Sequence, residues 1–128
     1  FVEELMEKKE SAEIEFKSAA GGFPKAFWET YSSFANTNGG TIVLGIKEKK
    51  GEFHVDSLTD ELIDKYKKEF WSGVNNRDIV NLNLLSNDDV VDGELDGHKV
   101  LLFYIHICPY LHTGKQYMLF QPYHQYYL

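Results

Sequence analysis

The densest group of acidic side chains, Glu10, Glu13 and Glu15, stands beside Lys17 near the start of the 128-residue chain. In a strand, alternate side chains point the same way about 6.5–7 Å apart, so Glu13, Glu15 and Lys17 would share a face. A hard cation such as Mg²⁺ takes one or two carboxylates plus waters, and neighbouring glutamates on a strand converge on one ion only at full length. The same residues also fit a solvated strand face with a Glu–Lys pair worth about 0–1 kcal/mol, which spacing alone favours.

The only cluster of basic side chains is formed by lysines, in a chain whose net charge is −7. Residues 51–100 hold twelve acidic and five basic side chains, whereas residues 1–50 hold eight and seven. Phosphate neutralisation dominates the affinity of duplex binders, so this charge disfavours tight DNA binding by the domain alone. Weak nucleic-acid binding stays open through the five lysines that we single out, which are Lys17, Lys25, Lys47, Lys49 and Lys50.

A helix-to-strand turn is the element around which these charged residues are arranged. Aromatic residues recur at helical spacing after Pro24, which predicts a helix over residues 24–37. Residues 41–46 are rich in β-branched side chains and predict a buried strand. The residues between tolerate a left-handed backbone, and Gly45 permits close approach of a backbone or ligand. We therefore predict a turn motif rather than a phosphate-binding loop, formed by Asn36, Thr37, Gly39, Gly40 and Gly45.

The remaining pattern predicts one α+β domain over residues 1–128. We expect a mostly antiparallel mixed sheet that includes strands 13–17, 41–46 and 99–107, with helices 24–37 and 59–73 packed on the same face. Further predictions are a short helix at 1–9, a hairpin turn at 47–52, a strand at 81–85, and turns at Asp92-Gly93 and Asp96-Gly97.

The last part of the chain, residues 110–128, is an atypical aromatic tail. Its side chains could stack bases or pack on a second copy, which would make a homodimer through apolar surface. From about Gln116 onward it fits a product of a shifted reading frame. No apolar stretch is long enough to span a membrane, and the lone Cys108 in an apolar run suits a buried thiol in a reducing compartment. We therefore expect a cytoplasmic protein without membrane contact.

Three short motifs together closely resemble the Schlafen/AlbA-like DNA-binding domain family. They are Glu10-x4-Glu15-Phe-Lys17, Ala35-Asn-Thr-x-Gly-Gly40 and Gly45-Ile-x-Glu48. The resemblance covers about residues 10–109, and the combination is quite specific although each motif alone is weak. It implies an AlbA-like α+β fold and nucleic-acid binding, within bacterial proteins described as transcriptional regulators or divergent AAA-type ATPases.

In the animal Schlafen members, the resemblance also implies a metal-dependent endoribonuclease that uses three acids. Carried over position by position, these acids fall on Glu10, Glu15 and Glu48, which would then hold Mg²⁺ or Mn²⁺. Family members commonly carry an Asp-Asp pair where this chain has Lys47-Glu48. The lysine places a positive charge beside the site and weighs against nuclease activity. Lys17 falls on the lysine of the family's Glu-Phe-Lys motif.

The sequence therefore favours a nucleic-acid-binding module of a bacterial transcriptional regulator, with DNA preferred over RNA and no cofactor. Two alternatives stay open. One is a metal-dependent endoribonuclease, which would need Mg²⁺ or Mn²⁺ at its three acids. The other is an oligomerisation module that associates through the apolar tail.

Overall fold

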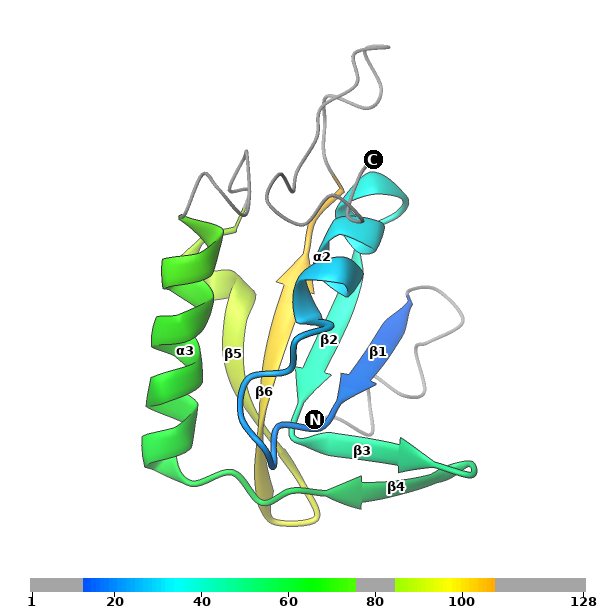
Figure 1. The fold of residues 1–128 in the computed structure, drawn as a ribbon, viewed down its shortest axis with the longest axis vertical. Helices are drawn as coiled ribbons and strands as arrows, with labels where there is room; N and C mark the ends of the chain where they lie inside the picture. The colour runs from blue at the N-terminus through cyan, green and yellow to red at the C-terminus, as the bar shows by residue number, and fades with distance from the viewer. Residues whose placement is uncertain (1–12, 76–84, 108–128) are drawn as a thin grey trace, which may run out of the picture.

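The structure is a computed structural model that describes residues 13–75 and 85–107 (Figure 1). Predictions for the helix 1–9, for Glu10, for most of the strand 81–85, for Cys108 and for the tail lie outside the described residues. The elements are β1 (Ile14–Lys17), α2 (Phe27–Asn36), β2 (Gly40–Leu44), β3 (Ile46–Lys49), β4 (Glu52–Val55), α3 (Asp60–Val74), the 3₁₀ helix η1 (Asn87–Asp89), β5 (Val90–Leu95) and β6 (His98–Ile105).

Four strands form one mixed sheet in the order β1-β2-β6-β5. β1 runs parallel to β2, and the β2–β6 and β5–β6 pairs are antiparallel. β3 and β4 form a separate two-stranded hairpin. The predicted α+β class with a mostly antiparallel mixed sheet is therefore confirmed.

Both long helices pack on one face of the four-stranded sheet, as predicted (Figure 1). Phe27 of α2 makes an edge contact with Phe70 of α3, with ring centroids 5.7 Å apart. The same Phe27 ring lies 4.9 Å from Phe103 of β6, so one aromatic cluster joins the two helices to the sheet. Tyr31, Tyr66 and Phe70 are almost fully buried in this cluster, which makes it the main core.

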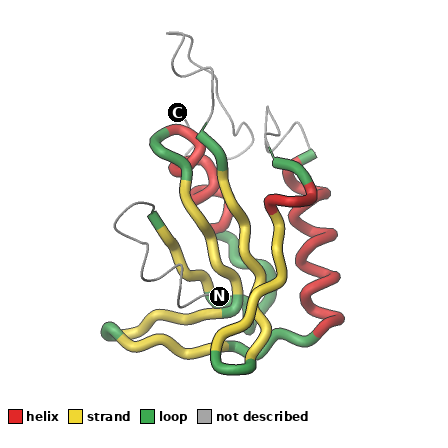
Figure 2. Tube along the Cα trace, turned by 180° about the vertical axis from the view of Figure 1, so that it is seen from behind, coloured by secondary structure: helices red, strands yellow, loops and turns green. Residues whose placement is uncertain are grey.

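A smaller apolar cluster covers the opposite face, where the sheet lies in front of the helices in Figure 2. Val43 and Leu102 lie opposite each other on neighbouring strands and belong to this cluster with Ile46. Phe16 of β1 extends it and meets Phe53 of β4 with ring centroids 4.9 Å apart. The β3–β4 hairpin is thus attached to the sheet through few side chains, and Phe53 itself is 38% exposed.

Some predicted boundaries are wrong. The hairpin turn predicted over residues 47–52 is confined to Lys50 and Gly51, because the flanking residues pair with one another in β3 and β4. Local turns interrupt two other expected elements. The strand predicted over 41–46 breaks at Gly45, and Ile46 pairs with Val55 in the second sheet. The helix predicted from Pro24 begins at Phe27, because the Pro24 carbonyl accepts from the Phe27 amide (3.1 Å) in a preceding turn.

The turn predicted at Asp92-Gly93 is also wrong, because both residues lie inside β5. They pair in register with Leu101 and Val100 of β6. The following pair, Asp96-Gly97, does form the predicted turn, and both residues have positive φ (51° and 79°). None of the helices in the described ranges is long and apolar enough to cross a membrane.

Candidate functional site

An open groove of about 400 Å³ brings β1 and the hairpin together. We call it the lysine groove, and the lining residues that matter here are Glu15, Lys17, Ser18, Lys47, Glu48 and Lys50. Five residues singled out from the sequence therefore meet in one place. The groove holds three lysines and two glutamates, so its charge is opposite in sign to the net charge of −7 of the whole chain.

Glu15 and Lys17 point from β1 toward the face of the sheet that the helices cover. In the parallel ladder they lie opposite Ile42 and Leu44, which both belong to the main core. Lys17 Nζ lies 3.8 Å from Glu15 Oε1, and its side chain is only 18% exposed. The predicted shared face is confirmed, because Glu13, Glu15 and Lys17 also line a neighbouring groove against α2.

The hairpin supplies the other charged groups through consecutive residues that are all exposed. Glu48 lies opposite Phe53 and Lys47 opposite His54 in the antiparallel pair. Lys50 has a left-handed backbone (φ 53°) ahead of Gly51 (φ 80°), the combination of positive φ values that a tight hairpin turn needs. Among residues 13–75 and 85–107, no carboxylate lies within ion-pair distance of Lys47, Lys49 or Lys50.

Gly45 is the junction that places the hairpin beside β1. Its φ of 108° is one that residues with a Cβ rarely adopt. Its amide donates to the Lys17 carbonyl at 2.9 Å, and its carbonyl accepts from the Asp56 amide at 2.7 Å. The Asp56 carboxylate in turn accepts from the Ser18 hydroxyl (3.0 Å) and the Ala19 amide (2.8 Å). Both ends of the hairpin are therefore tied to the end of β1.

The rest of the predicted turn motif serves packing and lines none of the lysine groove. A Cβ on Gly39 would lie 2.7 Å from a backbone oxygen of β6, and one on Gly40 would lie 2.7 Å from the Phe34 ring. The Asn36 amide and the Thr37 hydroxyl donate back to groups of the last turns of α2. The motif therefore sets the path from α2 into the sheet.

Glu15 and Glu48 share the lysine groove, but they do not by themselves fit a divalent metal ion. Within the described residues, no three acidic, histidine or cysteine side chains come close enough to hold one. The Lys17 ammonium group already stands beside the Glu15 carboxylate, and Lys47 and Lys50 line the same groove. A donor set of two carboxylates among three ammonium groups suits an anion better than a hard cation.

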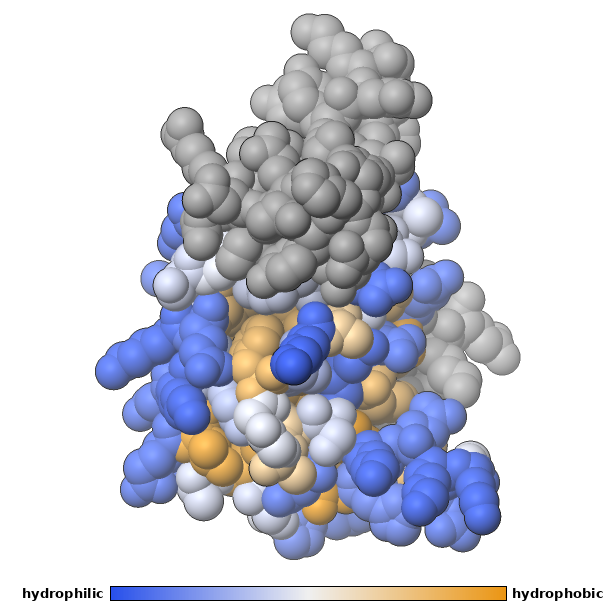
Figure 3. All heavy atoms as spheres, in the orientation of Figure 1, coloured by the Kyte–Doolittle hydropathy of each residue, from blue (hydrophilic) through white to orange (hydrophobic). Residues whose placement is uncertain are grey.

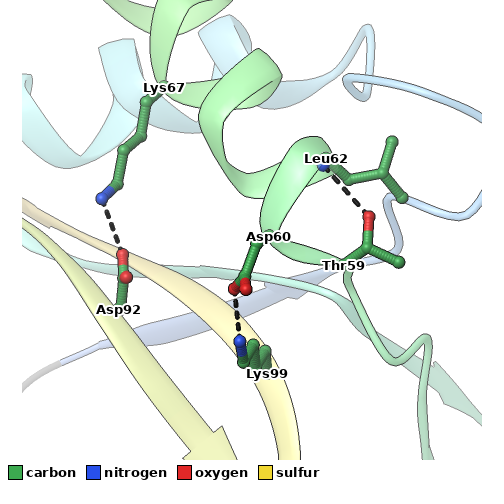
Figure 4. A network of polar contacts seen from close by, with 6 residues as sticks. All are labelled: Thr59, Asp60, Leu62, Lys67, Asp92 and Lys99. Carbon is green, nitrogen blue, oxygen red and sulfur yellow. Dashed lines mark hydrogen bonds and ion pairs between the residues drawn. The ribbon is translucent and has the colours of Figure 1, made fainter.

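Two lysines away from the hairpin, Lys67 and Lys99, are engaged in ion pairs between α3 and the β5–β6 strands, as Figure 4 shows. Lys67 Nζ lies 2.7 Å from Asp92 Oδ1, and Lys99 pairs with Asp60 at the start of α3. The hydrogen bond to Asp60 raises the pKa of Lys99. Lys25 precedes α2 and lines neither the lysine groove nor the groove against α2.

Sequence reasoning missed Asp56, which holds the segment after β1 in place. Its partners Ser18 and Ala19 lie 38 and 37 residues away along the chain, so no local pattern marks the contact. An aspartate after a strand is ordinary turn chemistry, and nothing in its neighbourhood distinguishes it.

Comparison with known proteins adds a family and a fold. The family model described as Schlafen, AlbA_2 matches residues 10–127, a range that includes most of the tail. The N-terminal domain of an ATP-dependent DNA helicase RecG-related protein from Nitrosomonas europaea is similar with a TM-score of 0.62, at 23% identity over 87% of this chain and 76% of that chain. The DIP2311 protein from Corynebacterium diphtheriae is similar with a TM-score of 0.50, at 23% identity over 78% of this chain and 21% of that one. No functionally curated protein matches.

Proposed function

The chain belongs to the Schlafen AlbA_2 family, and from that premise we propose that it is a nucleic-acid-binding module that holds phosphates in the lysine groove. The observation that carries the proposal is the local charge of this groove. Three lysines outnumber two glutamates there, in a chain whose net charge is −7. Phosphate contacts supply most of the affinity of such modules, and lysine ammonium groups serve as compact point charges.

The hairpin is well suited to present these charges. A two-stranded ribbon can lie against a nucleic-acid backbone or enter the major groove of a duplex. Lys47, Lys49 and Lys50 are exposed, and no described carboxylate pairs with them. The acidic remainder of the chain repels phosphate, so binding is weak and strongly dependent on salt.

DNA is the preferred nucleic acid, and the module acts as one part of a larger bacterial regulator. The family resemblance supports this assignment, as does likeness in fold to the N-terminal domain of a protein named as related to a DNA helicase. Lys25 precedes α2 outside the lysine groove, and we propose that it adds a separate phosphate contact.

The test measures binding of the whole chain to duplex DNA, single strands and tRNA while the salt concentration is varied. Lys47→Glu, Lys49→Glu and Lys50→Glu together should abolish binding. A matched control places the same three reversals at Lys65, Lys67 and Lys99, which changes the net charge equally.

Each lost phosphate contact lowers the slope of log K against log salt concentration by about 0.7–0.9. The control should lose none of these contacts, so its slope should stay close to that of the original chain. Equal loss of binding in both triple variants would contradict a site at the hairpin. Unchanged binding in the hairpin variant would instead favour the oligomerisation module.

A metal-dependent endoribonuclease that uses three acids is the second candidate, and one observation favours it. Glu15 and Glu48, two of the three acids that the family resemblance singles out, line the same groove. The assay is RNA cleavage by the purified chain with Mg²⁺ or Mn²⁺, compared with Glu15→Gln. Cleavage that persists equally in the variant belongs to a contaminant.

A further inference from the structure

A second open groove, of about 630 Å³, lies between α3 and the segment that follows β1. We call it the aromatic groove, and the lining residues used here are Gly21, Gly22, Phe23, Trp28, Lys68 and Glu69. On the face that Figure 3 shows, which is that of Figure 1, orange and pale residues gather in the middle, with hydrophilic side chains on both sides. The rings of Phe23 and Trp28 lie 6.0 Å apart, and Trp28 is stacked on Phe70 with an interplanar angle of 11°.

The chemistry of this groove suits a flat, uncharged ring. Lys68 and Glu69 cancel in charge at its rim, so it offers no net attraction for a phosphate. Aromatic side chains stack any nucleobase, because every base has a π-face. Gly21 leaves the entrance open, since a Cβ built on it would meet no atom within 4 Å.

The aromatic groove is held at a fixed spacing from the lysine groove. Ser18 lines the lysine groove and Gly21 lines the aromatic groove. Between them Ala19 is fully buried, its amide donates to Asp56 Oδ2 (2.8 Å), and its carbonyl accepts from the Tyr66 hydroxyl (2.7 Å). Burial, with Glu69 and Asp56 nearby, raises the pKa of Tyr66 and keeps this donor protonated.

The spacing matches a short length of nucleic-acid strand. Gly21 lies four positions after Lys17 in the chain, so their Cα atoms are at most about 14 Å apart. Stacked nucleotides rise about 3.4 Å each along one strand, so about four of them cover the same distance. A strand with its phosphates at Lys17 therefore reaches the aromatic groove within a few nucleotides.

We propose that the aromatic groove takes one unpaired base of a strand whose phosphates lie in the lysine groove, so that the protein prefers single strands to duplexes. The inference rests on the proposed function, because the lysine groove must first hold the backbone. Bases of an intact duplex are paired and stacked on one another, and they cannot enter the groove without leaving the helix.

The first experiment follows Trp28 by fluorescence in the Trp71→Phe chain, since the sequence contains two tryptophans. The probes are an oligodeoxythymidine of about 12 nucleotides, an abasic strand of equal length and the corresponding duplex. The thymidine strand should quench Trp28 and bind at least about fivefold more tightly than the abasic strand, because stacking one base is worth about 1–3 kcal/mol.

Equal affinity for thymidine and abasic strands without quenching of Trp28 would overturn the inference and leave the proposed function intact. Binding of no strand at all would overturn both. The two failures are therefore distinguishable in one series of measurements.

A second variant blocks the groove without removing core aromatic rings. Gly21→Leu places a side chain in open space, and the φ of Gly21 lies outside the left-handed region, so the fold should persist. The variant should lose the preference for bases while keeping its affinity for the abasic strand. Ala20→Leu is the matched control, because Ala20 is exposed and lines neither groove. Retention of the full preference in Gly21→Leu would overturn the inference.

Discussion

Lysines at the hairpin and lysines at the α3–β6 side have the same chemistry in different surroundings. Lys67 and Lys99 each contact an aspartate from a neighbouring element (Figure 4). The hairpin lysines have no such partner within the described residues. A lysine that already neutralises a carboxylate has less charge to offer a phosphate. The net charge of a chain is therefore a poor guide to where it binds anions.

The two regions also differ in how deeply their side chains are buried. α3 carries Tyr66 and Phe70, which are almost fully buried against the sheet. The hairpin instead packs through Ile46 in the smaller cluster and through the contact of Phe16 with Phe53, and it is held by the backbone bonds of Gly45. We expect α3 to contribute most to stability and the hairpin to contribute most to binding, and the predictions below test that division.

The largest expected effect comes from truncating one aromatic ring in each region. Phe70 is fully buried among other rings, so Phe70→Ala should lower the free energy of unfolding by about 3–5 kcal/mol. Phe53 is 38% exposed with one described ring neighbour, so Phe53→Ala should cost less than about 1.5 kcal/mol. Urea unfolding measures both. Similar losses would show that the hairpin belongs to the same packed core.

The next effect concerns the junction between the regions. Gly45→Ala should cost about 2–3 kcal/mol, because φ is 108° and the added Cβ would lie 3.2 Å from Leu58. Gly97→Ala is the matched control in the β5–β6 turn, with φ of 79° and open space away from both grooves, and should cost about 1–2 kcal/mol. Only Gly45→Ala should also weaken nucleic-acid binding, since it moves the hairpin away from Lys17. Equal binding by the two variants would argue against Gly45 as the junction.

The element types could be predicted from sequence because their causes are local. The cap of α3 is an example, since the Thr59 hydroxyl accepts from the Leu62 amide at 3.2 Å, as the residue types indicate. The break at Gly45 could not be predicted, because the β-branched run continues to Ile46 while the turn depends on Lys17 and Asp56. Asp92-Gly93 reads as a turn, yet its pairing with β6 is decided by the distant strand.

The charged residues of the candidate site could be identified from the sequence, but their meeting in one groove could not. Lys47, Lys49 and Lys50 are nearly consecutive, so their concentration is a local fact. Lys49 does not line the lysine groove, and the meeting of Lys47 and Lys50 with Glu15 and Lys17 depends on a hydrogen bond across 28 residues, from the Gly45 amide to the Lys17 carbonyl. The aromatic groove gave no signal, because the spacing of Trp28 and Phe23 resembles that of ordinary core residues.

A smaller effect on the free energy of unfolding is expected from replacing Asp89, the last residue of η1. Burial alone would raise the pKa of Asp89, but hydrogen bonds from Ser86 and His106 outweigh it and lower the pKa. A lowered pKa means that the stabilisation is present above the unfolded value of about 3.9 and is lost as pH falls through the folded value. Asp89→Asn should cost about 1–2 kcal/mol at neutral pH.

The measurement for Asp89 is the free energy of unfolding as a function of pH. The Asp89→Asn profile should be flatter on the acid side than that of the original chain. Asp88→Asn, at the exposed neighbour, should leave the profile almost unchanged. Nucleic-acid binding should be unaffected in both, because Asp89 lines neither groove. Parallel profiles for Asp89→Asn and the original chain would show that Asp89 does not contribute to the pH dependence of stability.

The smallest expected effect is the coupling between Lys67 and Asp92, whose side chains are 34% and 62% exposed. A double-mutant cycle with alanine at each position should give about 0.2–1 kcal/mol, because exposed pairs gain little Coulomb energy in water. In about 1 M salt the Debye length falls to about 3 Å, so the coupling should shrink toward zero. Lys67→Ala should also leave strand binding nearly intact, since its charge is already opposed by Asp92. A loss of binding as large as that of the hairpin variants would mean that paired and unpaired lysines are equivalent, and the contrast between the two regions would fail.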